Sequence, residues 1–301
     1  MGAGAVGAAF GARLAEAGHR VVFVARGRHL QALQEHGLTL LSRLGDVRLE
    51  HPEVVGDPRD AGRADLVLFT VKAQDSQAAA GMIAPIVDAD TRILTLQNGV
   101  EGVELLRRTF GDERVLGGVA YIEAVIEAPG LIVHKSPFAR IVFGPLAGPP
   151  GPAEAVRAAL EGAGVDVDLV DEPMTAIWSK WVLICAFSGL TALTRMPIGA
   201  VTARPETREM LRRAMEEIAA LARASGGTLP DDVVETTMRF MTDVAEPTMT
   251  SSLAQDLAAG KPLELEALNG AASRLGRELG VPTPVNDLIY AALVLHKDGT
   301  A

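Results

Sequence analysis

The apolar residues of this chain follow two different rhythms. Up to about residue 170, short apolar runs typical of buried parallel strands alternate with segments of helical periodicity. The clearest runs are Val21–Ala25, Asp65–Val71 and Arg92–Leu96, and helical spacing is found at 29–36, 76–86 and 101–110. This alternation predicts an α/β fold with a doubly wound sheet, in which helices join successive parallel strands.

The rest of this first region predicts further strands. Short strands at 37–42 and 47–49 indicate a small antiparallel excursion. The segments 115–126, 131–134 and 140–143 are expected to be strands joined by turns. After a Pro/Gly-rich connection at 146–152, a helix at 153–162 and a strand at 165–169 complete the region.

From residue 171 onward the pattern becomes helical. Helices are expected at 172–194, 205–225, 230–244, 263–279 and 286–296. We therefore expect two domains, an α/β domain over 1–170 and an all-helical domain over 171–301.

A glycine motif opens the chain and leads into a helix that ends near Gly18. Its spacing is G-x-G-x-x-G, followed by the helical segment 8–17 and then by the strand Val21–Ala25. Such glycines allow a tight turn and let backbone N–H groups approach a pyrophosphate at a helix N-terminus. The sequence thus predicts a Rossmann-type dinucleotide site built from Gly2, Ala3, Gly4, Ala5, Val6 and Gly7.

The strand that normally precedes this motif is absent from the printed chain, since only Met1 precedes Gly2. That strand is central in the sheet, and losing about four buried aliphatic side chains costs ~8 kcal/mol. We expect that the first strand is truncated here and that the native chain starts upstream of Met1.

The end of the second strand indicates which dinucleotide is bound. NAD enzymes place an acidic residue there to accept the ribose 2′-hydroxyl, whereas this chain has Arg26, with Arg28 beside it. A guanidinium suits a 2′-phosphate, so NADP is the expected cofactor.

Composition narrows the class of protein. The net charge of −10 argues against a nucleic-acid partner, and the single cysteine, Cys185, indicates a reducing cytoplasm. The longest apolar run, Trp181–Phe187, is too short to cross a membrane, and no signal peptide is evident. The six histidines show no ligand spacing, so no metal site is expected.

Lys180 is the main candidate for chemistry. It is one of five lysines in an arginine-rich chain, and it lies in an apolar helical segment, where Ile184 and Ser188 share its face. A desolvated ammonium at this place would donate a proton to a carbonyl oxygen, although a lysine that reaches solvent at the helix edge is the simpler alternative. Taken alone, the position of Glu264 indicates an acidic residue in the first turn of a helix, where it is favoured by the helix dipole. Ser251 and Ser252 indicate a helix N-cap.

Taken together, these segments resemble the ketopantoate reductase (2-dehydropantoate 2-reductase) family over essentially the whole chain. The matching segments are 2–7 with 10–14, 24–26, 71–73, 97–99, 178–181, 251–256 and 263–270. Each is short, but their order and spacing together are specific.

The resemblance implies NADPH-dependent reduction of a 2-oxo acid to a 2-hydroxy acid, with 2-dehydropantoate and pantothenate biosynthesis as the leading expectation. It implies that Lys180 is the catalytic proton donor and that Glu264 helps to hold the substrate and the lysine. It also implies that Ser252 lies near the substrate carboxylate and that Lys72 and Asn98 line the mouth of the cofactor cleft, with Asn98 reaching substrate as well.

Two positions depart from the family pattern. Ile184 and Ser188 stand where asparagines that touch the substrate's polar groups are common. An apolar isoleucine leaves a buried hydroxyl unpaired, which costs ~1–3 kcal/mol. A 2-oxo acid with a less polar tail therefore stays open as the substrate, as do a β-hydroxyacid or opine-type dehydrogenase and a non-catalytic NADP-binding regulator. The helical domain makes a homodimer plausible.

Overall fold

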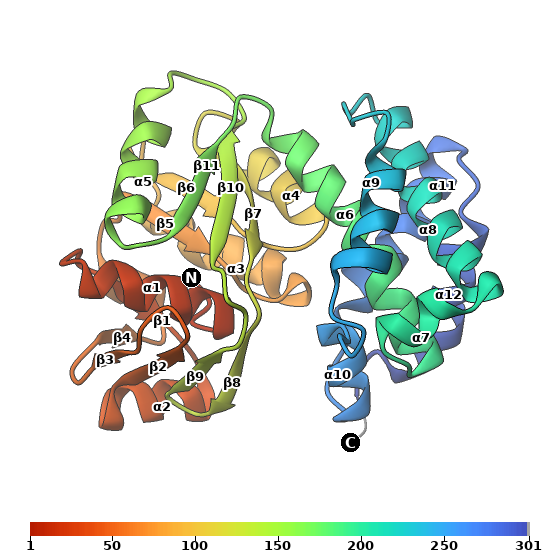
Figure 1. Cartoon of the computed structure of the whole chain (residues 1–301). Helices are drawn as coiled ribbons and strands as arrows, with labels where there is room; N and C mark the ends of the chain where they lie inside the picture. Colours follow the sequence, from red (N-terminus) through yellow and green to blue (C-terminus); the bar gives the residue numbers. More distant parts are fainter. Residues whose placement is uncertain (300–301) are drawn as a thin grey trace. The chain divides into compact units, whose positions relative to one another are not determined.

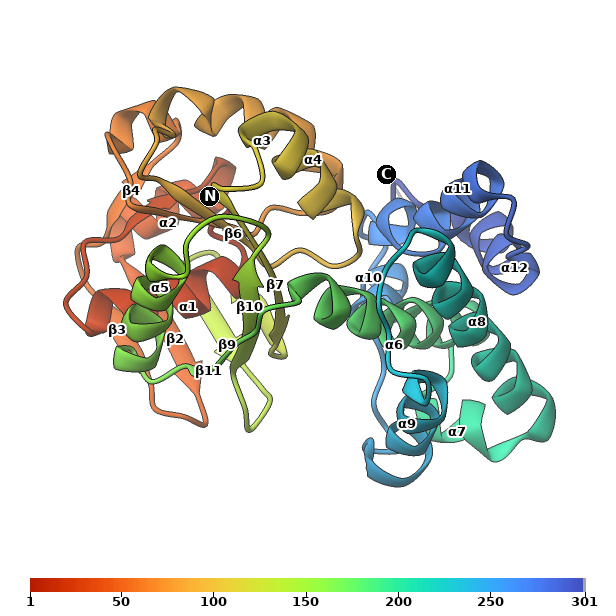
Figure 2. The ribbon, with the colours of Figure 1, turned by 90° about the horizontal axis from the view of Figure 1, so that it is seen from above.

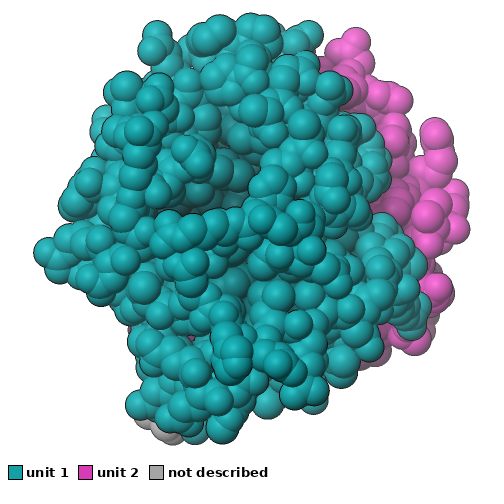
Figure 3. Space-filling model, turned by 90° about the vertical axis from the view of Figure 1, so that its left-hand side faces the viewer, with its two compact units in different colours: residues 1–97, 102–173 teal, residues 98–101, 174–301 magenta. Residues whose placement is uncertain are grey.

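The computed structural model describes residues 1–299. The chain divides into two compact units, coloured separately in Figure 3. Unit 1 comprises 1–97 and 102–173, and unit 2 comprises 98–101 and the chain from 174 onward. The short segment 98–101 was expected in the first domain, but its contacts are with the helical unit.

Unit 1 is organised around a five-stranded sheet in the order β11-β10-β7-β6-β5. The strands β5, β6 and β7 are parallel, while β10 runs antiparallel to β7 and parallel to β11. The Rossmann-type α/β fold is thus confirmed, with a mixed sheet in place of an all-parallel one. The bounds are β5 (Leu66–Phe69), β6 (Arg92–Thr95), β7 (Val115–Tyr121), β10 (Arg140–Pro145) and β11 (Asp166–Leu169).

Helices cover both faces of this sheet, which explains its continuous apolar runs. Phe10 and Leu14 of α1 share a core with Val156 and Leu160 of α5 and with Phe143 of β10. Figure 2 shows α1 and α5 on one side of the strands and α3 and α4 on the other. These helices are α1 (Ala5–Glu16), α3 (Ser76–Ile83), α4 (Glu101–Phe110) and α5 (Gly151–Gly162).

The residues in front of α1 bridge two sheets. A separate two-stranded parallel sheet is formed by β1 (Val22–Val24) and β4 (Glu53–Val55). The Ala3 N–H donates to the Val24 carbonyl (2.9 Å), and the Thr70 N–H donates to the Met1 carbonyl (3.0 Å). Residues 1–3 therefore run between β1 and the end of β5.

A third sheet, with four strands in the order β3-β2-β9-β8, lies beside α1 (Figure 1). Its apolar side chains pack against alanines of α1. The expected antiparallel pair of β2 and β3 is present, but β2 also pairs in parallel with β9. The expected strand 115–126 is divided, because the backbone of Glu123 pairs with Ser136 Oγ and the Lys135 N–H. The bounds are β2 (Leu38–Ser42), β3 (Val47–Leu49), β8 (Ala124–Ala128) and β9 (Leu131–His134), with α2 (Gly27–His36) crossing over after β1.

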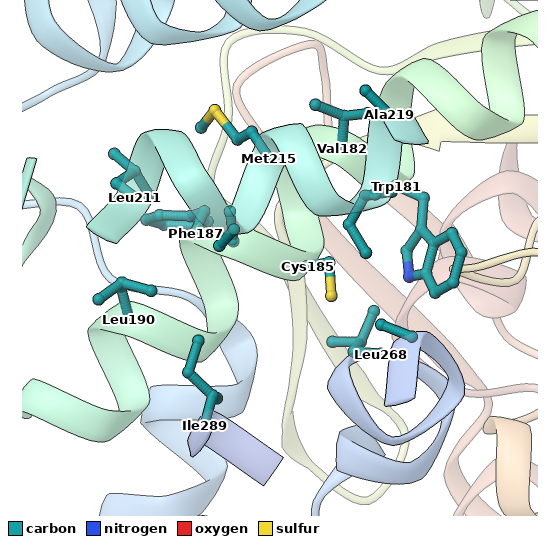
Figure 4. Packing of buried hydrophobic residues seen from close by; sticks show 14 of the residues in the cluster. Trp181, Val182, Cys185, Phe187, Leu190, Leu211, Met215, Ala219, Leu268 and Ile289 are labelled. Carbon is teal, nitrogen blue, oxygen red and sulfur yellow. The ribbon is translucent and has the colours of Figure 1, made fainter. Parts of the chain in front are cut away.

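Unit 2 is helical and is built around α6. Figure 4 shows side chains of α6, among them Trp181 and Phe187, packed with Met215, Leu268 and Ile289 from other parts of the unit. The bounds are α6 (Pro173–Thr194), α7 (Ile198–Ala203), α8 (Pro205–Ala224), α9 (Val233–Arg239), α10 (Ser252–Ala258), α11 (Asn269–Leu279) and α12 (Pro284–Leu293).

The cysteine of α6 lies inside this core. Cys185 is fully buried, and its thiol contacts two asparagine side chains, Asn269 and Asn286, at 3.4 and 3.3 Å. Glu217 of α8 accepts hydrogen bonds from the backbone N–H groups of Val285 and Asn286, and so holds the start of α12. The core of unit 2 therefore contains a hydrogen-bonded polar network.

One expected helix in this unit is interrupted. The segment expected as a helix at 263–279 consists of a 3₁₀ turn, η5 (Glu264–Ala267), followed by α11. The break is at Leu268, whose φ and ψ are −104° and −100°. The backbone carbonyl of Glu266 accepts a hydrogen bond from the Arg274 side chain (2.6 Å). This carbonyl therefore has a hydrogen-bond partner although the helix is interrupted. The expected helix at 230–244 likewise ends at Arg239 and continues as a π turn.

By length and composition alone, α6 could cross a membrane, with a mean hydropathy of 1.5 over its most apolar window. The apolar run Trp181–Phe187, which is too short to span a membrane, is only part of this helix. However, 67% of that window is buried inside the protein, as in the core helix of a soluble protein.

Candidate active site

The glycine turn is held on the end of β5. Gly2 has a φ of +89°, which favours glycine, and a Cβ there would lie 2.8 Å from the Val71 nitrogen. Thr70 Oγ1 donates to the Gly2 carbonyl (2.8 Å), and a Cβ on Gly7 would collide with both of these groups. Gly2 and Gly7 are thus required by packing within the turn.

Gly4 is different, because a Cβ there would meet no protein atom within 4 Å. It is the N-cap residue of α1, and no side chain caps that helix end. The first turn of α1 also carries no acidic residue. An open space beside uncapped N–H groups fits a phosphate group, so the turn is suited to the pyrophosphate of a dinucleotide.

Arg26 follows β1 at the carboxyl edge of the strands, where dinucleotides bind in such folds. Its side chain is 81% exposed and donates from Nη2 to Asp75 Oδ2 at 2.5 Å. Asp75 is 49 residues farther along the chain, where it is the last residue of η2 (Ala73–Asp75) and the N-cap of α3. Asp75 was not predicted as this partner, because nothing in the sequence around it distinguishes it.

Lys72 lies at the same edge, in the turn between β5 and η2, and its side chain is exposed. Gln97 supports this turn, since its Nε2 donates to the Val71 carbonyl (2.8 Å) and to Ser76 Oγ (2.7 Å). Structure therefore places the glycine turn, Lys72 and Arg26 in unit 1, around the carboxyl ends of β1 and β5.

The catalytic candidates are in unit 2. Lys180 lies on α6, and Glu264 begins η5. Both side chains are partly buried, and their charges interact. Desolvation lowers the pKa of Lys180 to about 8, while the carboxylate of Glu264 opposes part of that change. A pKa near neutrality is what a catalytic proton donor needs.

Asn98 belongs to the same unit. The segment 98–101 follows β6, and Gly99 has a φ of +81°. A Cβ on Gly99 would lie 2.8 Å from the Ala267 carbonyl, so the segment packs directly on η5. Asn98 is thereby brought to the turn that carries Glu264.

Arg274 of α11 fastens these two pieces together. It donates to both carboxylate oxygens of Glu101 (3.0 and 3.1 Å) and to Glu266 Oε2 (2.7 Å). Glu266 also accepts from the Tyr290 hydroxyl (2.9 Å). Sequence reasoning did not single out Arg274, although its arginine type and its spacing from Glu266 were visible.

The remaining predicted substrate residues have different environments. Ile184 is partly buried, and Ser188 is buried on the same helix as Lys180. Ser252 is exposed as the first residue of α10. The N-cap is Ser251, whose Oγ accepts from the Ala254 N–H (3.1 Å) and bonds Thr191 of α6 (2.8 Å).

Among residues 1–299, no group of three or more His, Cys, Asp or Glu side chains could hold a metal ion.

Comparison with known proteins gives the same picture over the whole chain. A family model described as ketopantoate reductase PanE/ApbA matches residues 1–148, and its C-terminal counterpart matches 172–297. A 2-dehydropantoate 2-reductase of Mycobacterium tuberculosis (strain ATCC 25618 / H37Rv) is 32% identical, over 99% of this chain and 97% of that protein.

Solved structures share the fold. A PanE/ApbA family ketopantoate reductase from Ralstonia eutropha JMP134 is 37% identical, with a TM-score of 0.89 over 99% of this chain and 97% of that one. A D-mandelate dehydrogenase with NADH and anilino(oxo)acetate is 22% identical, with a TM-score of 0.90 over 98% and 96% of the two chains. The family resemblance inferred from the motifs is confirmed: the chain belongs to the ketopantoate reductase PanE/ApbA family, whose members are NAD(P)H-dependent oxidoreductases.

Proposed function

We propose that this protein catalyses the NADPH-dependent reduction of a 2-oxo acid to a 2-hydroxy acid, with 2-dehydropantoate as the first candidate substrate. The observation that carries the proposal is the partly buried Lys180, with its lowered pKa, beside Glu264. A chain that only bound the dinucleotide would have no use for a desolvated ammonium paired with a carboxylate.

The cofactor would be held by residues of unit 1. Backbone N–H groups at the start of α1, beside Gly4, would bind the pyrophosphate, and Arg26 would bind the 2′-phosphate. Lys72 adds positive charge at the same edge. When bound, NADPH supplies the hydride that is added to the carbonyl carbon.

Lys180 would deliver the proton. As the carbonyl oxygen gains negative charge, the ammonium donates one proton to it and becomes a neutral amine. Glu264 keeps the ammonium protonated near neutral pH, because a nearby carboxylate favours the charged form. Asn98, packed on the same turn, would donate hydrogen bonds to the substrate.

Ile184 favours a second candidate within the same chemistry. It lies one helical turn after Lys180, on the same face of α6, and presents an apolar side chain where an asparagine is common in the family. A 2-oxo acid whose tail lacks a hydroxyl avoids an unpaired polar group at this position.

The test is NADPH oxidation by the purified protein with 2-dehydropantoate and with 2-oxo acids carrying alkyl or aromatic tails. We expect Lys180→Ala to lower kcat by ~10²–10⁴-fold and to leave the Kd for NADPH within about twofold. Near-normal turnover by this variant would refute the role of the lysine. Tight NADPH binding without turnover of any acid by the wild type would favour the regulator.

The substrate tail is tested with Ile184→Asn. If the substrate is a 2-oxo acid with an apolar tail, this change should raise the ratio of kcat/KM for 2-dehydropantoate to kcat/KM for the apolar acids by about tenfold. Leu193→Asn is the matched control, because Leu193 is a partly buried leucine of the same helix and lies more than three turns away from Lys180.

A further inference from the structure

We infer that Asp75 is a specificity-determining residue that sets the preference between NADPH and NADH. Its carboxylate would repel the 2′-phosphate at Arg26 and would accept a hydrogen bond from the ribose 2′-hydroxyl of NADH. The inference rests on the proposed dinucleotide site and concerns a residue outside the glycine motif.

The pair of side chains is clearly defined. Arg26 Nη2 donates to Asp75 Oδ2 at 2.5 Å, and the two side chains are 81% and 30% exposed. Arg26 is presented by the end of β1 and Asp75 by the start of α3. Two separate elements thus bring a cation and an anion to the edge where the ribose of a dinucleotide is expected.

Capping of a helix does not explain the carboxylate. Asp75 occupies the N-cap position of α3, where aspartate commonly accepts from a backbone N–H. Its side chain makes no such bond and reaches Arg26 instead. An exposed ion pair contributes little to stability, so the pairing itself is a weak reason for an acid here.

The chemistry of the two cofactors predicts opposite effects. A carboxylate at this edge normally reads the 2′-hydroxyl of NAD, and it repels the 2′-phosphate of NADP. In such folds that acid usually lies at the end of the strand that follows the glycine motif. In this chain the strand is β1, and Arg26 occupies the position of the acid. Asp75 supplies a carboxylate from a neighbouring segment. The site therefore holds one group suited to NADP, the guanidinium of Arg26, and one suited to NAD, the carboxylate of Asp75.

Asp57 is another carboxylate near this edge, but it is already engaged. It lies two residues beyond Val55 of β4, which pairs with Val24 of β1. Its side chain accepts from the backbone N–H and the guanidinium of Arg59, and these bonds lower its pKa to about 2. Asp75 is therefore the acid that is directed at Arg26.

The experiment measures the Kd values of NADPH and NADH for the full chain by isothermal titration calorimetry. Asp75→Asn keeps the shape of the side chain and removes its charge. We expect the Kd for NADPH to fall by about 3- to 10-fold at low salt and the Kd for NADH to rise by a similar factor. The NADPH effect shrinks at high ionic strength, because exposed charges are screened.

Opposite changes for the two cofactors are the required signature, since a purely structural role would change both Kd values in the same direction. Equal shifts, or none, would overturn the inference. Asp112→Asn is the matched control: Asp112 is an exposed, arginine-paired aspartate that precedes the amino end of β7. It should leave both Kd values unchanged.

Arg26→Gln separates this inference from the proposed cofactor site. If Arg26→Gln leaves the NADPH/NADH ratio unchanged, the 2′-phosphate assignment itself fails. If Arg26→Gln lowers that ratio while Asp75→Asn does not raise it, the cofactor site stands and only the role of Asp75 is rejected.

Discussion

At the scale of single residues, the glycines of one motif meet different requirements. Gly7 has no room for a Cβ against Thr70 and the Gly2 carbonyl, whereas Gly4 has open space. The first is needed for packing. The second has no packing reason to be glycine: it suits the N-cap position of α1, and its open space agrees with the proposed approach of a pyrophosphate.

This contrast predicts the outcome of two alanine variants. Gly4→Ala should lose only about 1 kcal/mol of unfolding free energy as a poorer N-cap, and should bind NADPH more weakly by about tenfold or more, because its methyl group occupies the space of the pyrophosphate. Gly7→Ala should lose about 1–3 kcal/mol of unfolding free energy through overpacking. Thermal unfolding and NADPH titration of both variants check this. Unchanged binding by Gly4→Ala would contradict the placement of the pyrophosphate.

Lys180 illustrates a conflict between stability and function. Its pKa is lowered from 10.5 to about 8 in the folded state, so the folded protein disfavours the charged form. Below pH 8 the lysine is protonated in both the folded and the unfolded states, and the full penalty is present. Between pH 8 and 10.5 the unfolded state binds more protons, so the penalty disappears as the pH rises.

Lys180→Met should therefore raise the unfolding free energy at pH 7 by about 1–3 kcal/mol, less than the full shift because Glu264 loses its cation. The gain should decrease toward pH 10. Denaturant unfolding across this range measures it, with Lys261→Met as an exposed control. A gain that does not vary with pH would point to packing instead of charge.

The sequence could identify some site residues and not others, for physical reasons. Lys180 stood out because a lysine in an apolar helix is costly to bury. Ser251 and Ser252 could not be told apart, since which of two adjacent serines caps a helix depends on where the chain turns. Asp75 could not be identified, because its partner is 49 residues away and is reached only through the fold.

At the scale of elements, the 3₁₀ turn η5 is the part that sequence patterns did not predict. The spacing of apolar residues predicted a continuous helix over 263–279. Instead, the Arg274 side chain donates hydrogen bonds to the backbone carbonyl and to the carboxylate of Glu266. The same arginine binds Glu101, the last residue of the segment 98–101. One side chain therefore holds the turn of Glu264 and the segment of Asn98 in place.

We expect Arg274→Ala to lower the unfolding free energy by about 1–3 kcal/mol and kcat/KM for the 2-oxo acid by about tenfold or more. The Kd for NADPH should stay unchanged, because the arginine acts within unit 2. Arg277→Ala, an exposed change on the same helix, is the control. Arg274→Lys should recover less than half of the loss, since lysine lacks the fork that spans two partners.

At the scale of the whole molecule, the order of elements was predictable and the pairing of strands was less so. Strands such as β5 and β6 are recognisable as continuous apolar runs, because helices cover both faces of their sheet. β4 was not predicted, because it has only three residues, lies beside charged residues and a proline, and is too short to show an alternation of apolar and polar residues. The split of β7 from β8 depends on partners that are distant in the sequence.

The whole molecule also predicts independence from metal ions. No suitable cluster of ligands exists in residues 1–299, and in the proposed mechanism Lys180 would supply the positive charge that a metal supplies in other dehydrogenases. Prolonged treatment with EDTA should leave kcat, KM and the melting temperature unchanged. A loss of activity that zinc restores would show that this account of the site is wrong.

The buried thiol of Cys185 has a practical consequence. It is the only cysteine in the sequence, it lies in the centre of the helical core, and burial raises its pKa well above the usual value. A thiol reagent can therefore modify the native chain only when the helical unit opens. The rate of a single colorimetric labelling reaction thus reports how often this unit opens, with no engineered probe.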